Sequence, residues 1–399
     1  MKDTRLWTLE FINMGCSNLF FFMSQYILVA ALPIFIMDDM GGGEWEAGLA
    51  MTFFQIGTVA CRPVAGRLID AFNKRKMLAA ASILFFLIML GFNFAHSLHY
   101  ILGLRLVHGI IFAIGTTTSA TLAALLLPAS RKGEGIGYFA VSGNMAMVIG
   151  PLAGLLIIHQ LGSSALFIFL TVMAMATILV SMSKKLPDSV EQPSPVKRKG
   201  WSINDFVEKK ALPMAVLGGL VFFAYGGVLT FIPMYAKTLG MEASTSLFFM
   251  VFALVIIITR PLVGYVFDRQ GPDYTVYPGF FFFAAGFLLF SRAEGLTGFM
   301  VSAAVLGTGF GALSPAFQTL AVQAASNERA GVATATYFWS LDISVGLAAA
   351  CLGGVAKNWG YPFMYGTVSV AAVVVAVLFY FFWARNRQKK VASSLIVKK

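Results

Sequence analysis

Charged side chains are scarce in this chain of 399 residues. Only 12% of the residues are charged, against about 25% in an average soluble domain. Hydrophobic residues make up 58% of the chain and the mean hydropathy is +0.79, so a soluble fold of this size could not cover its surface with polar groups. Aromatic residues make up 14%, which excludes a disordered chain because disordered segments are poor in aromatics. The composition therefore predicts a polytopic membrane protein.

Paired cysteines and the common motifs of catalysis are also missing. The three cysteines, Cys16, Cys61 and Cys351, lie far apart in apolar segments and form no CxxC pair, which argues against a disulfide framework or a zinc site. The chain has no GxxxxGKS/T loop for ATP, no HExxH and no GxSxG. We therefore expect no enzymatic activity, no metal, no cofactor and no use of ATP by this chain.

Apolar runs long enough to cross a bilayer, which takes about 20 residues in a helix, fill the chain. They lie at 9–37, 45–70, 76–96, 98–127, 134–160, 163–183, 212–239, 243–268, 275–292, 296–325, 330–357 and 361–384. Twelve such runs predict an all-α membrane protein of twelve transmembrane helices. They leave no room for a separate soluble catalytic domain.

Positive charges gather in the loops of one side of the membrane. The basic residues of that side lie at 2 and 5, 74–76, 131–132, 184–210, 269, 329 and 385–399. Because loops rich in Lys and Arg stay in the cytoplasm, we expect a multi-pass protein of the cytoplasmic membrane with both termini in the cytoplasm. This topology accounts for the net charge of +11 and removes the interpretation that nucleic acid is a partner.

The two halves of the chain repeat each other. The matching segments are 62–70 with 260–268 (198 residues apart), 32–35 with 232–235 (200 apart) and 129–136 with 325–332 (196 apart). Parallel repeats are a transporter architecture, with the substrate site between the halves near the middle of the bilayer. We therefore predict two pseudo-symmetric six-helix bundles. The predicted division is a bundle at 1–183, a cytoplasmic linker at 184–211, a bundle at 212–384 and a cytoplasmic tail at 385–399.

The loop after the second predicted helix carries a recognisable signature. Gly66 and Asp70 are followed by a basic cluster at 74–76, with Asn73 where a glycine is usual, and a degenerate copy follows the eighth helix. This pattern resembles the loop signature of the major facilitator superfamily and, with twelve spans and a central linker, implies that family's fold over the whole chain. The resemblance implies a gating role for these residues: Gly66, Asp70, Arg75, Gly264, Asp268 and Arg269.

Asp70 also poses a physical problem, because it ends a helix whose C-terminus is the negative end of the helix dipole. Something positive should therefore face it. The candidates are a basic loop residue or the N-terminus of a helix from the other half, which would hold the cytoplasmic side closed. The alternative is a carboxylate exposed to solvent at the end of its helix.

Arg105 lies several residues inside the fourth predicted span, where a charge costs about 2.5–3.5 kcal/mol on insertion scales. It should therefore face a cavity or a carboxylate. His108 lies one turn away on the same face and could relay protons. The segment 105–109 resembles the family's second motif, whose arginine is linked to proton coupling. The alternatives are an arginine that clamps backbone carbonyls and a neutral, hydrogen-bonded histidine.

The fifth span carries Gly150-Pro151-Leu152-Ala153-Gly154. This segment partly resembles the antiporter signature of the superfamily, in which Ala146 and Leu155 would both be glycine. The resemblance implies proton antiport and export, with Gly150, Pro151 and Gly154 as the motif residues. The alternative is that these small residues serve helix packing.

Asp342 is the sharpest single candidate, because it lies near the centre of the eleventh span with no Lys or Arg within a turn. A buried carboxylate without a cationic partner favours its protonated form, as a proton carrier requires, and buried ionisable groups in spans are functional candidates. The alternatives are an ion pair with Arg105 or direct binding of a cationic substrate. The predicted proton-coupling set is Asp342, Arg105, His108 and Glu10.

Polar residues form a stripe on one face of the first span, at spacings typical of a helix face. Glu10 in this stripe could instead be a surface residue at the end of the helix. The predicted substrate-cavity residues are Asn13, Ser17, Gln25, Tyr26, Tyr138, Asn144, Tyr225, Gln318, Tyr337 and Trp339.

These features together predict a secondary transporter that exports a small organic molecule by proton antiport with alternating access, of the drug or multidrug efflux type. One alternative is a dedicated exporter of an endogenous polar metabolite, such as an amino-acid-like or metal-chelating compound. Another is uptake by proton symport. A receptor on a transporter fold would need an added soluble domain, which the sequence does not predict. The expected partners are the small-molecule substrate and the lipid bilayer, and we expect a monomer.

Overall fold

The computed structural model describes residues 6–182, 190, 203–241 and 244–396, without the side chains of 44, 203–204, 349–350 and 382–396. Every regular element in these ranges is a helix. The first half contains α1 (Leu9–Ile34), a π-helical turn (Phe35–Asp39), α2 (Glu44–Ala71), α3 (Lys74–Gly91), a 3-10 turn (Phe92–Phe94), α4 (Leu98–Leu126), a 3-10 turn (Ala129–Arg131) and α5 (Lys132–Met182).

The second half repeats this order. It contains α7 (Ile203–Phe206), α8 (Leu212–Thr238), α9 (Thr245–Gln270), α10 (Asp273–Ser291), α11 (Gly295–Gln323), a 3-10 turn (Asn327–Arg329) and α12 (Ala330–Ile396). The predicted linker at 184–211 lies largely outside the described residues. The predicted tail begins as a continuation of α12.

Two glycines divide the two longest helices. Gly162 in α5 has φ +83° and Gly360 in α12 has φ +82°, values that favour glycine because a side chain would clash there. Each glycine turns the chain back on itself and creates two antiparallel segments. With this division the helices match the predicted apolar runs to within a few residues, except that the last helix continues to Ile396, beyond the predicted end at 384.

Nine described segments are long and apolar enough to cross a membrane by length and composition. The helix α2 is not among them, because Gln55 and Arg62 lower its hydropathy. The number of twelve spans therefore stays a prediction, although the all-α architecture of two pseudo-symmetric bundles is confirmed.

The start of α3 explains the departure from the loop signature at position 73. The Asn73 side chain accepts a hydrogen bond from the Lys76 amide at 2.9 Å and caps the helix. Asparagine is among the best N-caps, because its oxygen satisfies one of the free amides of the first turn. The substitution for glycine therefore supplies the cap of α3.

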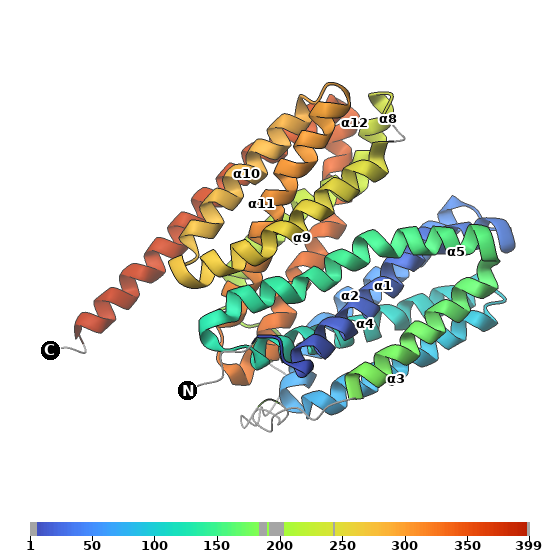
Figure 1. The fold of residues 1–399 in the computed structure, drawn as a ribbon, viewed down its shortest axis with the longest axis horizontal. Helices are drawn as coiled ribbons and strands as arrows, with labels where there is room; N and C mark the ends of the chain where they lie inside the picture. Colours follow the sequence, from blue (N-terminus) through green and yellow to red (C-terminus); the bar gives the residue numbers. More distant parts are fainter. Residues whose placement is uncertain (1–5, 183–189, 191–202, 242–243, 397–399) are drawn as a thin grey trace.

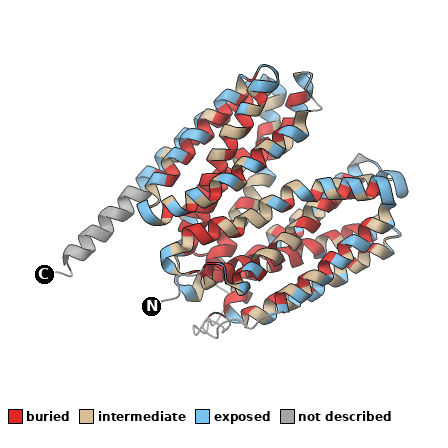
Figure 2. Cartoon of the chain, in the orientation of Figure 1, coloured by how far each residue is buried: buried red, intermediate tan, exposed pale blue. Residues whose placement is uncertain are grey.

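The helices form two bundles, α1–α5 and α8–α12, which lie side by side (Figure 1). They meet along two helix pairs, α5 with α9 and α2 with α12. Each bundle has its own aromatic core, around Phe21 and Phe85 in the first and around Phe252 and Phe287 in the second. Buried residues line the inside of each bundle and the region between them (Figure 2). We call the side where α2, α4, α9 and α11 end and α3, α5, α8, α10 and α12 begin the linker side, and the opposite side the far side.

Candidate functional site

Asp70 joins the two bundles at the linker side. Its carboxylate accepts hydrogen bonds from the backbone amides of Gly331 at 2.8 Å and Val332 at 3.1 Å, which lie in the first turn of α12. The free amides and the dipole of a helix N-terminus form a natural anion site. A helix N-terminus of the other half therefore faces the negative charge at the end of α2. This is one of the two partners that the sequence predicted for Asp70.

Asp268 makes the same contact in the opposite direction. It accepts from the amides of Gly133 and Glu134, both at 2.8 Å, in the first turn of α5. Each bundle thus provides one carboxylate and one helix N-terminus. We call these two contacts, at Asp70 and at Asp268, the linker-side clasps.

The clasps correct one of the predicted repeat spacings. Gly133 and Gly331 hold equivalent places, 198 residues apart, and so do the two helix starts at Lys132 and Ala330. The match of 129–136 with 325–332 at a distance of 196 is therefore wrong by two residues. The small residues of these loops allow a second, false register when only their identities are compared.

Close packing explains the glycines that precede the two aspartates. A Cβ on Gly66 would lie 2.5 Å from Ala335 Cβ and 2.9 Å from the Gly331 carbonyl. A Cβ on Gly264 would lie 2.5 Å from Glu134 Cα. Contacts this short are not found in real structures, so a larger residue would push the bundles apart at the clasps.

The basic members of the predicted gate lie elsewhere. Arg75 donates to the Met182 carbonyl at 3.2 Å, within its own bundle. Arg269 lies over the ring of Tyr265 at 4.7 Å, on its own helix. Neither has a described contact with the other bundle, and the geometry of the clasps comes from the aspartates and the helix ends.

An ion pair joins the bundles deeper in the molecule. Arg62 Nε of α2 donates to Asp342 Oδ2 of α12 at 2.7 Å, with exposed side-chain fractions of 2% and 21%. Arg62 Nη1 donates to the hydroxyls of Thr116 at 2.8 Å and Thr117 at 2.9 Å. Arg62 lies nine residues from the end of α2, about 14 Å along a helix, and hence near the middle of a bilayer about 30 Å thick.

This pair corrects the expectation that Asp342 has no cationic neighbour. The alternative of a pair with Arg105 is also wrong, because the partner is Arg62, 280 positions away. In the sequence, Arg62 stands out only as part of the repeat. The available signal was the same one that marked Arg105, a charge well inside an apolar helix.

The repeat places a related contact on the other side of the interface. Arg260 of α9 lies 198 positions after Arg62, and Asn144 of α5 lies 198 positions before Asp342. With the Asn144 amide oriented to satisfy both groups, its oxygen accepts from Arg260 Nε at 3.2 Å and Nη2 at 3.1 Å. One half of the interface thus has an arginine–carboxylate pair where the other has an arginine–amide pair.

Arg105 and His108 form a separate network inside the first bundle. Arg105 donates to the Ala50 carbonyl at 3.2 Å and, through both Nη atoms, to Gln25 Oε1 at 3.3 Å. His108 lies between Ser24 Oγ and Arg105 Nη1, both at 3.2 Å. No carboxylate contacts Arg105 in the described part of the chain, so the geometry fits the clamp and the hydrogen-bonded histidine. A role for these residues in proton coupling stays a prediction.

The other predicted cavity residues are spread over both bundles. Tyr225 donates to Met147 Sδ across the interface, whereas Tyr337 donates to the Ser314 carbonyl at 2.8 Å within its bundle. The ring of Tyr138 packs against Trp7 at 4.8 Å. Asn13, Ser17 and Gln318 are buried, whereas Glu10, Tyr26 and Trp339 are half-buried.

Comparison with known proteins identifies the family. The family model of the Major Facilitator Superfamily matches residues 14–349. The chain belongs to the Major Facilitator Superfamily. An uncharacterized MFS-type transporter of Burkholderia mallei is 27% identical over 375 residues, covering 92% of this chain and 90% of the relative. The MFS-type transporter YhhS of Escherichia coli is 26% identical over 380 residues, covering 92% and 91%.

Solved structures with this fold are similar over nearly the whole length. The human organic anion transporter MFSD10 has a TM-score of 0.78 at 14% identity, covering 93% of this chain and 98% of that one. The transporter FucP in the outward conformation has a TM-score of 0.77 at 15% identity, covering 94% and 99%. These structures show the shared fold, whereas the family match and the curated relatives establish a membrane secondary transporter of the superfamily.

The partial antiporter motif lies where α5 of the transporter crosses α1. A Cβ on Gly150 would lie 2.7 Å from Tyr26 Cβ, and one on Gly154 would lie 3.0 Å from the Ile27 carbonyl. Pro151 lies between them inside the helix. These contacts show why small residues are needed there. They do not bear on the direction of transport.

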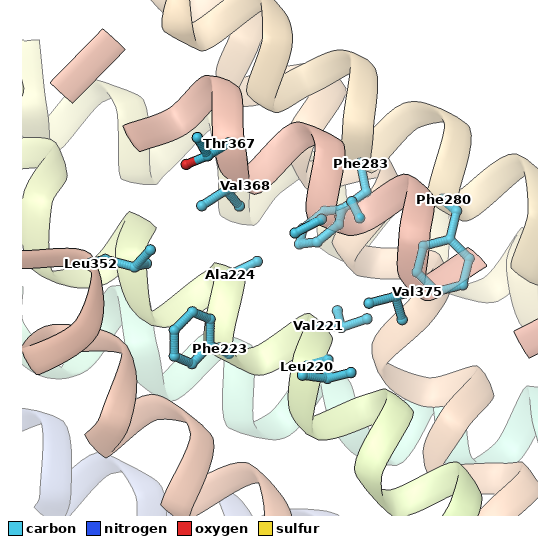
Figure 3. Close-up of a pocket in the computed structure, with 12 residues that line it drawn as sticks. Leu220, Val221, Phe223, Ala224, Phe280, Phe283, Leu352, Thr367, Val368 and Val375 are labelled. Carbon is cyan, nitrogen blue, oxygen red and sulfur yellow. The ribbon is translucent and has the colours of Figure 1, made fainter. Parts of the chain in front are cut away.

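A cavity of about 280 Å³ lies inside the second bundle of the transporter, among α8, α10 and α12 (Figure 3). Its wall is apolar, with Phe223, Phe280 and Phe283 around it, and Thr367 has the one hydroxyl among the described residues that line it. None of the predicted substrate-cavity residues lines it. The candidate site is therefore the interface between the bundles, where the charged residues lie.

Proposed function

We propose that this transporter exports a small organic molecule across the cytoplasmic membrane by proton antiport with alternating access. The observation that carries this proposal is the Arg62–Asp342 pair. A carboxylate that is one-fifth exposed joins α12 of one bundle to α2 of the other. Protonation of Asp342 would remove the negative charge that attracts Arg62. Proton binding at this carboxylate would therefore weaken a contact between the two bundles.

The described contacts between the bundles agree with such a mechanism. The two clasps close the linker side, and Gln55 adds a hydrogen bond to the Asp342 carbonyl at 3.4 Å. The cross-bundle hydrogen bonds named here lie at the linker side or near the middle of the helices. The proposed cycle opens these contacts when Asp342 is protonated and re-forms them when the proton leaves.

Direction and orientation rest on sequence features. The basic loops of the linker side support its placement in the cytoplasm by the positive-inside rule. The partial antiporter motif at Gly150, Pro151 and Gly154 supports export. The described conformation, closed at the linker side, is then the one that faces away from the cytoplasm.

The buried charges between the bundles and inside the first bundle favour a dedicated metabolite exporter over a drug pump. Arg62, Arg105 and Arg260 are each no more than 2% exposed, and Asp342 is the one carboxylate in a described contact with any of them. An excess of buried positive charge disfavours a lipophilic cation through Coulomb repulsion, which is strong where the dielectric constant is low. The geometry therefore supports a polar substrate.

The test is accumulation of labelled compounds in inside-out membrane vesicles with an imposed pH gradient. Ethidium serves as the lipophilic cation and hippurate as the polar organic acid. We expect gradient-dependent accumulation of hippurate by wild type and by Asp342→Glu, and none by Asp342→Asn. The control is Asp39→Asn, which removes an exposed carboxylate at the far side and should transport as wild type.

Three results would each contradict part of the proposal. Accumulation by Asp342→Asn equal to that of wild type would remove Asp342 from coupling. Accumulation that persists after the gradient is collapsed would exclude proton antiport. Accumulation of ethidium in place of hippurate would favour a drug-efflux pump over an exporter of polar metabolites.

A further inference from the structure

Arg260 is a buried cation with an unused hydrogen-bond donor. Its side chain is 2% exposed, and Nη1 has no hydrogen-bond partner in the described structure. Its Nε and Nη2 atoms are satisfied only by the neutral amide of Asn144. Burial of a charge without a counter-charge is costly, so a residue in this state has a strong tendency to bind an anion.

The equivalent arginine of the other half shows what Arg260 lacks. The Arg62 guanidinium is satisfied by the Asp342 carboxylate and by two hydroxyls, those of Thr116 and Thr117. The positions 198 residues from these partners hold an amide for the carboxylate, Ser314 for the first threonine and Pro315, which has no hydroxyl, for the second. The repeat therefore keeps the arginine in both halves, but in the second half it replaces the carboxylate by an amide and one of the two hydroxyls by a proline.

We infer that Arg260 binds a carboxylate of the transported substrate, which takes the place that Asp342 occupies on Arg62. The Arg62–Asp342 pair shows that a carboxylate fits an arginine in this setting at 2.7 Å. The planar fork of Arg260 has Nη1 free, and a carboxylate that displaces Asn144 from Nη2 would have the two-pronged geometry that guanidinium groups prefer. This inference rests on the proposed function and assigns its substrate class as organic acids.

The test is a thermal unfolding measurement on the purified full-length transporter in detergent. Three pairs of probes differ only in carboxylate against carboxamide: acetate and acetamide, benzoate and benzamide, and hippurate and hippuramide. A ligand that binds the folded state raises the unfolding temperature. We expect at least one carboxylate to raise it more than its amide does in wild type.

Two variants and one control assign the effect to Arg260. Arg260→Gln removes the cation, and Asn144→Asp gives Arg260 the internal carboxylate that Arg62 already has. Both should weaken binding of the carboxylate about ten- to hundredfold, as expected for loss of a charge-assisted contact. Arg292→Gln, an exposed arginine at the far side, should leave it unchanged. Asn144→Asp should unfold no earlier than wild type, because it completes an ion pair.

The inference is overturned if carboxylates and amides act alike in wild type, or if the carboxylate preference survives in either variant. The measurement uses no gradient and no membrane. A failure here leaves the vesicle test of proton antiport untouched, and a failure of that test leaves carboxylate binding at Arg260 standing.

Discussion

Asp70→Asn should open the linker side. Asp70 is 2% exposed and accepts two amides, at 2.8 and 3.1 Å. The variant keeps one acceptor oxygen without the charge. Loss of one charge-assisted hydrogen bond costs about 1.5–3 kcal/mol, and loss of the charge at the helix N-terminus adds about 0.3–1 kcal/mol. The total of about 2–4 kcal/mol lowers the ratio of clasped to open molecules about 30- to 900-fold.

Double electron–electron resonance measures this shift directly. Spin labels are placed at Lys76 of α3 and Gln323 of α11, two exposed positions in different bundles at the linker side, after the three cysteines are replaced by serine. Asp70→Asn should move the distance distribution to longer values, and Asp268→Asn should do the same by symmetry. Glu294→Gln removes an exposed carboxylate at the far side and should not. An unchanged distribution in Asp70→Asn would refute the clasp.

Three further predictions follow from single contacts. Gly264→Ala should lengthen the same spin-label distance, because its Cβ would lie 2.5 Å from Glu134 Cα, whereas Gly137→Ala, whose Cβ would lie 3.4 Å from the nearest atom, should not. Gly162→Ala should lower the unfolding temperature in detergent, since φ is +83° and ψ is 174°, a region that only glycine adopts readily and that costs other residues about 1–3 kcal/mol. Gly346→Ala, in an open helical position, is the control. His108→Gln keeps a donor and an acceptor between Ser24 and Arg105 but cannot titrate, so proton-coupled accumulation should persist; its loss would make His108 a relay.

The helices were accessible from the sequence because the signals are local. Long apolar runs mark the spans, and their ends agree with the structure within a few residues, apart from the end of α12. The turns at Gly162 and Gly360 also fall at gaps between predicted runs. The helix dipole alone was enough to predict that a helix N-terminus could face Asp70. Each of these inferences depends on residues within a few turns of each other.

The ion pair was not accessible in the same way. Arg62 and Asp342 are 280 positions apart, and which faces of α2 and α12 meet depends on how the whole bundles dock. Asp342 could be marked as a buried charge, but its partner could not be chosen among several arginines. Arg62 and Arg260 both lie at about the depth of Asp342, so depth alone left two candidates. Arg105 lies nearer the far side, where Gln25 and the Ala50 carbonyl accept its hydrogen bonds. Depth in the membrane follows from position in the chain, whereas facing does not.

The two halves of the repeat share the same clasp contacts but differ in the acceptors of their buried arginines. In each clasp a carboxylate of one bundle accepts hydrogen bonds from a helix N-terminus of the other. The two aspartates are 198 positions apart in the chain, and so are the two helix N-termini. Symmetry there is expected, because the two contacts hold the same closed state together. The arginine contacts keep the cation in both halves and differ in the acceptor, with Asp342 on one side and Asn144 on the other. In the function and the inference proposed above, Asp342 exchanges the proton and Arg260 binds the substrate carboxylate. The difference in acceptor between two equivalent arginine contacts is what allows these two roles to be divided between the halves.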